Sequence, residues 1–332
     1  MSGPEVMGPV LSIRDLTVEF TTPTGTVHAV TEVSLDVHPG EVVGVVGESG
    51  CGKTATLLGG MRLLPEPPAR IVGGEVLLHG RDLLRMSRRE LRRVRGREVG
   101  VVFQDPLTSL HPSMRVGEQI AEALRVHDRH RSASSARARA VELLELVGVP
   151  AAAARFRDYP HQWSGGMRQR AMIAAAIANR PAVLIADEPT TALDVTIQAQ
   201  VLDVLRLARA ETGAAIVLVS HDLGVIAEMA DRVVVMYAGR VVETGSVESV
   251  FAAPRHPYTA ALLASVPRLD GPVVLTDPIP GQPPALRVLP SGCGFAERCP
   301  CRHERCCTEA PPARSGTVHQ VACHFPLRSG DT

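Results

Sequence analysis

The sequence has few aromatic residues and no excess of charge of either sign. Phe, Trp and Tyr make up 3% of the 332 residues, although apolar residues make up 45%. Val, Leu, Ile and Ala must therefore fill the core of one large domain, or of a large domain with a smaller one. Lys plus Arg and Asp plus Glu each number 35, so the formal net charge is zero. A nucleic-acid-binding protein usually carries a basic excess, so we expect no nucleic-acid partner.

Segments that would enter a membrane are also missing. The first residues show no basic stretch followed by an apolar one, so no secretory signal is predicted. No apolar run approaches the roughly 18 residues that span a bilayer. We therefore expect a soluble chain that reaches a membrane only through a partner.

Strand and helix patterns alternate along the chain. Three early runs alternate apolar with polar residues, as half-buried antiparallel strands do, at 10–13, 16–20 and 27–37. Four runs are continuously apolar, which is typical of a parallel sheet covered on both faces, at 42–46, 183–186, 215–219 and 233–237. Helical patterns lie between them, for example at 197–211, so an α/β fold with a parallel sheet is predicted.

Composition divides the chain into parts. Residues from about 106 to 178 are rich in helix signals and predict a helical insertion. The basic run at 85–97 has no interleaved aromatic residue and is interpreted as a solvated helix face rather than a nucleic-acid patch. Pro, Gly and Cys become frequent after residue 266. We therefore expect a large domain at 10–265 and a small cysteine-rich extension at 266–332.

The sequence GESGCGKT fits G-x-x-x-x-G-K-[ST] and directly follows an apolar strand. Glycines in such a turn let backbone N–H groups converge on phosphate oxygens, and the following helix adds its positive end. Lys53 is expected to reach the β- and γ-phosphates of ATP, and the Thr54 hydroxyl to bind Mg²⁺. Cys51 occupies a variable position. The predicted nucleotide contacts here are Gly47, Ser49, Gly50, Cys51, Gly52, Lys53 and Thr54.

An apolar strand ends in two carboxylates, Asp187 and Glu188. The C-terminal ends of parallel strands are where ligands of such sheets bind. Asp187 is expected to hold Mg²⁺, and Glu188 to accept the proton of the attacking water as general base. An acidic strand end is a weak signal alone and becomes strong after a phosphate-binding turn.

The sequence WSGGMRQ at 163–169 resembles the signature of ATP-binding cassette (ABC) proteins, which is usually LSGGQ. The Trp and the Met replace the commoner Leu and Gln, which matches the peptide-importer branch. A Ser-Gly-Gly that opens a helix suits an anion, because a hydroxyl, N–H donors and the positive helix end meet there. The resemblance implies that Ser164, Gly165 and Gly166 bind the γ-phosphate of ATP held by the other subunit. It also implies the P-loop NTPase fold of ABC ATPases, with an antiparallel β subdomain and a helical subdomain.

Four further residues take roles from the same resemblance, which covers about residues 10–265. Gln104 is similar to the glutamine that links Mg²⁺ and the attacking water to the membrane-subunit contact. Asp194, in Ala-Leu-Asp, resembles the loop that joins the two active sites of the dimer. His221 resembles the switch histidine at the γ-phosphate, and Phe20 the aromatic that stacks on adenine, with His28 as the alternative. A histidine at a strand end is more often structural, and a phenylalanine on an early strand is ordinarily core.

Three stretches resemble the dipeptide/oligopeptide importers: QDPLTSL at 104–110, YPHQWSGG at 159–166 and HPYT at 256–259. The resemblance implies ATP hydrolysis that powers peptide import, at the cytoplasmic face of the cell membrane. The implied partners are a second, paralogous ABC ATPase, two permease subunits and an extracytoplasmic solute-binding protein. Nickel or another small solute is an alternative cargo. An ABC protein acting on DNA or ribosomes is a further alternative, disfavoured by a single cassette without heptads.

Six of the seven cysteines lie between Cys293 and Cys323. Such crowding in a cytosolic protein indicates metal binding or redox chemistry rather than disulfides. Thiolates hold zinc or iron–sulfur clusters, and no C-x2-C knuckle typical of zinc occurs here. Resemblance to the tail of peptide-importer ATPases favours a [4Fe-4S] cluster with a structural role, while Zn²⁺, free thiols and a redox sensor remain alternatives. The expected ligands are Cys293, Cys299, Cys306 and Cys323, with Cys301 and Cys307 as extra candidates.

Overall fold

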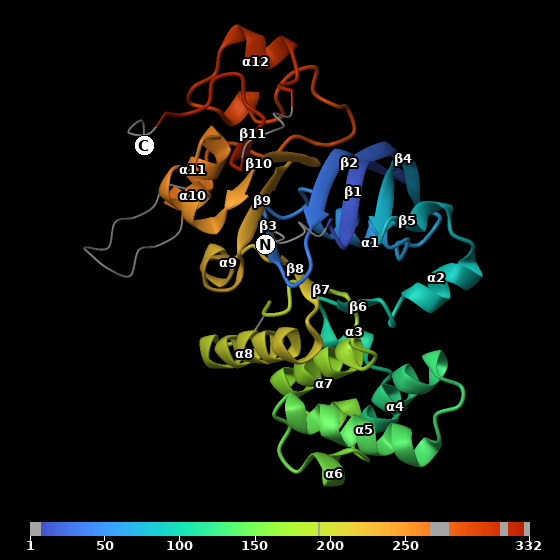
Figure 1. Cartoon of the computed structure of the whole chain (residues 1–332). Helices are drawn as coiled ribbons and strands as arrows, with labels where there is room; N and C mark the ends of the chain where they lie inside the picture. The colour runs from blue at the N-terminus through green and yellow to red at the C-terminus, as the bar shows by residue number, and fades with distance from the viewer. Residues whose placement is uncertain (1–7, 192, 266–278, 313–317, 329–332) are drawn as a thin grey trace, which may run out of the picture. The chain divides into compact units, whose positions relative to one another are not determined.

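The computed structural model describes residues 8–191, 193–265, 279–312 and 318–328 (Figure 1). These residues form two compact units. The first unit contains 37–42 and 85–219, together with the start of the described chain. The second unit contains 12–36, 43–84 and the described residues from 220 onward. Each unit is described by itself below.

Three parallel strands lie in the first unit, in the order β6 (Val99–Val102), β7 (Val183–Asp187) and β8 (Ala215–Val219). Every residue of β7 and β8 is buried, as expected for continuous apolar runs covered on both faces. β8 has the bounds predicted from the sequence. β7 extends one residue beyond the prediction, so that Asp187 forms its C-terminal end.

Helices make up most of the first unit. The segment at 106–178 contains α3 to α7, and α7 packs against α3, α4, α5 and α8 (Figure 1). α4 buries Ile120 and Leu124 on one face at helical spacing and exposes polar residues on the other. The helices are α2 (Arg88–Val94), α3 (Pro106–Ser109), α4 (Val116–His127), α5 (Ala133–Leu146), α6 (Ala152–Arg155), α7 (Gly165–Ile177) and α8 (Val195–Thr212).

Two sheets form the framework of the second unit. One has the order β2 (Gly25–Val37), β1 (Leu11–Thr22), β4 (Ala69–Leu78) and β5 (Arg81–Asp82). The runs at 10–13 and 16–20 belong to one strand, β1, because Asp15 adopts a φ of 49° that shifts the apolar alternation without ending the strand. In the other, β3 (Val42–Val46) pairs in parallel with β9 (Arg232–Tyr237), and β10 (Arg240–Ser246) pairs antiparallel with β9 and with β11 (Gln320–Val321).

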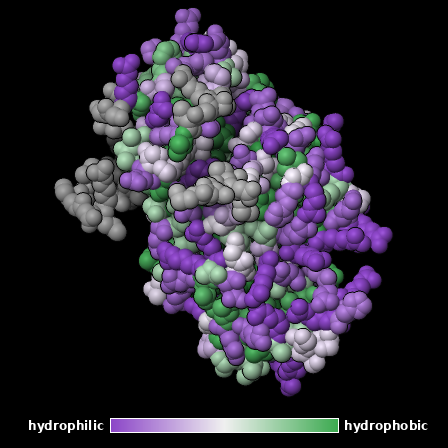
Figure 2. All heavy atoms as spheres, in the orientation of Figure 1, coloured by the Kyte–Doolittle hydropathy of each residue, from purple (hydrophilic) through white to green (hydrophobic). Residues whose placement is uncertain are grey.

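Short helices complete the second unit: α1 (Lys53–Gly60), α9 (Leu223–Met229), α10 (Val247–Ala252), α11 (Pro257–Ala264) and α12 (Glu304–Thr308). Throughout the described ranges, no helix combines the length and apolar character needed to cross a bilayer. On the face drawn in Figure 2, hydrophobic side chains lie in scattered groups among hydrophilic ones.

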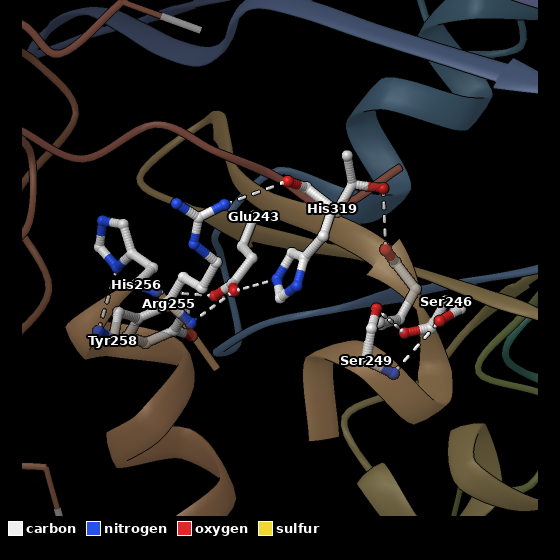
Figure 3. Close-up of polar contacts among 9 residues, drawn as sticks. Glu243, Ser246, Ser249, Arg255, His256, Tyr258 and His319 are labelled. Atoms are coloured by element: carbon white, nitrogen blue, oxygen red, sulfur yellow. Dashed lines mark hydrogen bonds and ion pairs between the residues drawn. The ribbon is translucent and has the colours of Figure 1, made fainter. Parts of the chain in front are cut away.

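A buried carboxylate ties the C-terminal part of the second unit to β10 (Figure 3). The Glu243 side chain is fully buried and accepts hydrogen bonds from the backbone N–H groups of Arg255, at 2.6 Å, and His256, at 2.9 Å. Its Oε1 also lies 2.6 Å from Nε2 of His319, next to β11. These contacts satisfy a carboxylate that would be costly to bury without partners.

We expect Glu243→Ala to lower the free energy of unfolding by about 3–5 kcal/mol, because removing one partner of a buried polar cluster leaves the others without an acceptor. Chemical denaturation of the full chain measures this loss. Glu248→Ala, at an exposed position in the first turn of α10, is the control and should cost below about 1 kcal/mol. Equal losses in the two variants would contradict the assigned role of Glu243.

Candidate nucleotide-binding site

The glycine-rich turn between β3 and α1 has a shape that only glycine permits at two positions. Gly47 has a φ of 152°, and a Cβ there would lie 2.2 Å from the carbonyl oxygen of Met236. Gly52 has a φ of 100°, and a Cβ there would lie 2.4 Å from the carbonyl oxygen of Ala29. Side chains at these positions would displace the backbone, so the glycines determine the path of the turn.

Lys53 is the first residue of α1, and its side chain lies within this phosphate-binding loop. The residue is 5% exposed, and its Nζ donates hydrogen bonds to the carbonyl oxygens of Gly47, at 2.8 Å, and Glu48, at 3.1 Å. The first N–H groups of a helix have no acceptor within it and favour an anion. Burial raises the pKa of the neighbouring Cys51 thiol, which suits a structural residue better than a reactive one. An ammonium and a helix N-terminus in one loop make it suited to phosphate.

Directly after the acidic end of β7, in the first unit, Glu188 holds its carboxylate in a defined orientation. This residue adopts a left-handed φ of 45°, and its N–H donates to the carbonyl oxygen of Val219 at 3.0 Å. One oxygen of its carboxylate accepts hydrogen bonds from Gln104 Nε2 and Thr191 Oγ1, both at 2.9 Å. Backbone strain of this kind in a non-glycine residue is concentrated at functional sites. Asp187, which is buried, directly precedes it.

Thr191 was not predicted as a site residue. The structure brings the predicted Gln104, which follows β6, to the predicted Glu188, which follows the neighbouring strand β7. The position of Thr191 three residues after the carboxylate, in the same turn, is the only signal available in the sequence.

The signature segment opens α7. Ser164 is the N-cap, its Oγ accepts a hydrogen bond from the N–H of Met167 at 3.4 Å, and Ser164 and Gly165 are exposed. Gly166 is buried, and a Cβ there would lie 2.6 Å from the side chain of Ile197 on α8. Trp163 is buried as well and donates from its indole N–H to a carboxylate oxygen of Asp158 at 3.1 Å. The segment therefore presents a helix start, with its hydroxyl, at the surface of the first unit.

The remaining predicted residues have these local settings. Asp194 is the N-cap of α8 and accepts from the N–H of Ile197 at 2.9 Å, while Ala192 lies outside the described residues. His221 is exposed, one residue before the N-cap of α9. Phe20 is half-buried on β1. His28, half-buried on the neighbouring strand, lies 3.1 Å from a carboxylate oxygen of Glu19.

Two residues missed by the sequence analysis contact the phosphate-binding loop. The phenol oxygen of Tyr258 accepts a hydrogen bond from the N–H of Glu48 at 2.8 Å. The guanidinium of Arg298 forms two hydrogen bonds with the Glu48 carboxylate, at 2.7 and 2.9 Å. Tyr258 belongs to the HPYT stretch that indicated the importer family, and Arg298 directly precedes a predicted cysteine ligand. Their contacts with the loop had no local signal.

Five cysteines line one small cavity of the second unit: Cys293, Cys299, Cys301, Cys306 and Cys323. Burial, reinforced by the charges of neighbouring cysteines, raises the pKa of the Cys299 and Cys323 thiols to about 11. All four expected ligands are in this set. Cys307 is not, and its thiol lies 3.8 Å from the carbonyl oxygen of His303. Within the part of the chain that the structure describes, no three His, Cys, Asp or Glu side chains are arranged to hold a metal ion, so the structure does not support the predicted cluster.

A buried histidine faces the same cavity. His256 is 1% exposed, and its Nδ1 accepts a hydrogen bond from the N–H of Tyr258 at 3.0 Å. Burial lowers the pKa of His256 to about 3, so the ring is neutral and its proton resides on Nε2. That Nε2 is buried and has no hydrogen-bond partner in the described structure. The cavity thus combines five thiols with one unsatisfied N–H donor.

A glycine-rich loop holding a buried lysine, a strand ending in Asp-Glu and a Ser-Gly-Gly helix start together define an ATP-binding cassette protein. Residues 30–191 match the family model described as ABC transporter, and residues 242–306 match the one described as oligopeptide/dipeptide transporter, C-terminal region. The chain belongs to the oligopeptide/dipeptide branch of the ABC transporter ATP-binding proteins.

Similar proteins agree with this family. The dipeptide transport ATP-binding protein DppD of Bacillus subtilis is 49% identical over 300 residues, which cover 90% of this chain and 89% of that protein. The oligopeptide transport ATP-binding protein OppD of Mycobacterium tuberculosis is 51% identical over 319 residues, covering 96% of this chain and 52% of OppD. The chain thus spans about half the length of this relative. A solved dimeric ATP-binding cassette in a post-hydrolysis state, bound to ADP and phosphate, matches with a TM-score of 0.64 and 28% identity, over 71% of this chain and 98% of that one.

Proposed function

We propose that this chain hydrolyses ATP to power the import of dipeptides or oligopeptides through an ABC transporter. The observation that carries the proposal is the match of residues 242–306 to the C-terminal region of oligopeptide/dipeptide transporters, on a chain that also has the cassette motifs. The high identity to DppD along most of its length supports the same cargo class. Nickel or another small solute is the alternative cargo, since no side chain described above selects a peptide.

In the proposed mechanism, the phosphate-binding loop and Lys53 bind the β- and γ-phosphates and offset their charge. Thr54, Asp187 and Gln104 offer hydroxyl, carboxylate and amide oxygens, the hard donors that suit Mg²⁺. When bound, Mg²⁺ would neutralise charge that develops on the phosphate oxygens.

Glu188 takes the proton of the attacking water, and its hydrogen bonds from Gln104 and Thr191 fix the direction of its carboxylate. We further propose that Ser164, Gly165 and Gly166 contact ATP held by the partner ATPase. His221 would contact the γ-phosphate, and Phe20 would stack on adenine.

The proposed partners are a second, paralogous ATPase, two permease subunits and an extracytoplasmic solute-binding protein, with the chain at the cytoplasmic face of the membrane. The segment around Gln104 supports a protein contact. Phe103 and Leu107 are 39% and 65% exposed on either side of Asp105, which caps the short helix α3. Exposed apolar side chains beside a catalytic glutamine suit a surface that receives a permease segment. The division into a cassette at 10–265 and an extension at 266–332 is part of this proposal.

Co-expression with permease, partner ATPase and binding protein, followed by ATPase assays in liposomes, tests the function. We expect ATP hydrolysis to rise when the binding protein is loaded with a peptide mixture. Stimulation only by a nickel- or sugar-loaded binding protein would show that the cargo is not a peptide, while the assignment as a transporter ATPase would stand. Stimulation by DNA or ribosomes, without co-purifying permease, would overturn the transporter itself.

We also propose that the cysteine cavity holds a [4Fe-4S] cluster, with Zn²⁺ as the alternative, bound by Cys293, Cys299, Cys306 and Cys323. Two features of the cavity suit such a group. Five thiols gather in one apolar cavity, where deprotonated sulfur needs a cationic group to compensate its charge. His256 also lines this cavity, and its buried Nε2–H, which has no partner in the described structure, suits an anionic sulfur acceptor. The bound group would supply folding energy to a region with little apolar core.

Anaerobically purified protein is expected to contain iron and acid-labile sulfide in equal amounts, and to lose both in Cys299→Ser and Cys323→Ser. Cys307→Ser, outside the cavity lining, is the matched control and should retain both. Iron chelation should lower the melting temperature of the wild type. Purified protein that contains zinc and no iron would favour Zn²⁺ as the bound metal. Wild-type protein that contains neither metal would contradict both proposals.

A further inference from the structure

The second residue of the phosphate-binding loop, Glu48, is held by residues far along the chain. Its carboxylate receives both terminal nitrogens of Arg298, at 2.7 and 2.9 Å, and the Arg298 side chain is only 5% exposed. Two parallel charge-assisted hydrogen bonds from a guanidinium are both strong and directional. The backbone N–H of Glu48 donates a hydrogen bond to the phenol oxygen of Tyr258, a residue that is fully buried. Glu48 is therefore fixed through its main chain and its side chain.

The anchor of the guanidinium is itself rigid. Arg298 also donates to the phenol oxygen of Tyr237, at 3.1 Å, and to the carbonyl oxygens of Pro280 and Ile279, at 2.8 and 3.2 Å. The ring of Phe295 packs against both tyrosines, with centroids 5.2 Å from Tyr237 and 5.4 Å from Tyr258, and the two tyrosine rings contact each other at 4.5 Å. A side chain with this many satisfied donors and packed neighbours holds a single geometry.

The segments that contact the phosphate-binding loop also supply residues that line the cysteine cavity. Phe295 and Arg298 lie between Cys293 and Cys299, and the 3₁₀ turn Ala296–Arg298 connects them. His256, two residues before Tyr258, faces the cavity and accepts the Tyr258 N–H. Both residues that hold Glu48 therefore come from elements that also form the cavity.

A carboxylate in a phosphate-binding loop opposes the binding of an anion unless it is neutralised. The carbonyl oxygen of Glu48 also accepts a hydrogen bond from Lys53, the residue expected to contact phosphate. Displacing Glu48 would thus leave its negative charge unpaired near the phosphates. It would also move the carbonyl oxygen that accepts the hydrogen bond from Lys53. We infer that Arg298 and Tyr258 are positioning residues of the phosphate-binding loop, through which the cysteine-rich segment at 293–307 sets the affinity for ATP. This inference rests on the proposed binding of ATP.

Titration of the full chain with a fluorescent ATP analogue tests the inference. Arg298→Gln is expected to weaken binding about tenfold, because it leaves the half-buried carboxylate of Glu48 without its guanidinium partner beside the phosphates. Glu48→Gln combined with Arg298→Gln should recover most of that loss, since neither charge remains. Arg298→Lys should lie between the wild type and Arg298→Gln. Arg305→Gln, which removes an exposed ion pair with Glu309, is the matched control and should bind ATP normally.

The reconstituted transporter supplies a second readout, in which Arg298→Gln should raise KM for ATP about tenfold and change kcat less than twofold. Tyr258→Phe, which removes only the hydroxyl, should raise KM for ATP about threefold. This variant still tests the inference if Arg298→Gln fails to fold. Wild-type affinity in folded Arg298→Gln and Tyr258→Phe, or a double variant weaker than Arg298→Gln, would overturn the inference. Failure of the wild type to bind the analogue would overturn the proposed function instead.

Discussion

Glu188→Gln is expected to bind ATP normally and to lose turnover by at least about 100-fold, the lower end of the contribution of a general base. Glutamine has nearly the shape of glutamate, and its amide oxygen can accept the hydrogen bonds from Gln104 and Thr191. The local geometry should therefore survive while the proton acceptor is lost. The variant should remain as a closed dimer with its partner ATPase in the presence of ATP, measured by size-exclusion chromatography beside an ATPase assay.

Glu122→Gln is the matched control, because Glu122 is an exposed acid on α4 in the same unit. It should hydrolyse ATP at the wild-type rate. A Glu188→Gln variant that also did so would show that Glu188 is not the general base.

Lys53→Ala is expected to weaken ATP binding about 10- to 100-fold, the range for losing one or two hydrogen bonds from a charged group. Lys53 is the only lysine among the 35 basic residues, so every other cationic side chain is arginine. A compact ammonium fits between the carbonyl oxygens of Gly47 and Glu48, where the planar fork of arginine does not. Lys53→Arg should therefore fail to restore binding, although it keeps the charge.

A lysine-directed reagent offers an independent check on the same residue. It should inactivate the wild type, and ATP should protect against inactivation. The role assigned to the loop would be contradicted if ATP failed to protect Lys53 from labelling. It would also be contradicted if a folded Lys53→Ala variant bound ATP normally.

The sequence predicted those parts of the fold that depend on local pattern. β3 and β8 have the predicted bounds because a buried parallel strand is a continuous apolar run between turns. β1 was predicted as two strands, because Asp15 shifts the alternation while the strand continues. The glycine-rich loop could be recognised because its motif gathers nearly all of its chemistry within eight consecutive residues.

Contacts between distant residues could not be predicted in this way. Arg298 and Glu48 are separated by 250 positions, and nothing around either residue specifies the other. The same holds for the buried contact of Glu243 with His319. The sequence predicted that the cysteines would gather, and the four expected ligands do line one cavity, but it did not separate the two extra candidates, of which Cys301 lines the cavity and Cys307 does not. Cys306 and Cys307 are adjacent on α12, where successive side chains point in different directions, and only Cys306 lines the cavity.

Peptide accumulation in proteoliposomes tests the central claim most directly. The vesicles would contain the permease, the partner ATPase and this chain, with a labelled oligopeptide on the binding protein and Mg-ATP on the side of the ATPases. The account predicts accumulation that requires ATP and is lost when Glu188→Gln replaces the wild-type chain. The account would be contradicted if peptide accumulated equally with the Glu188→Gln variant. It would also be contradicted if no peptide accumulated while another solute was imported.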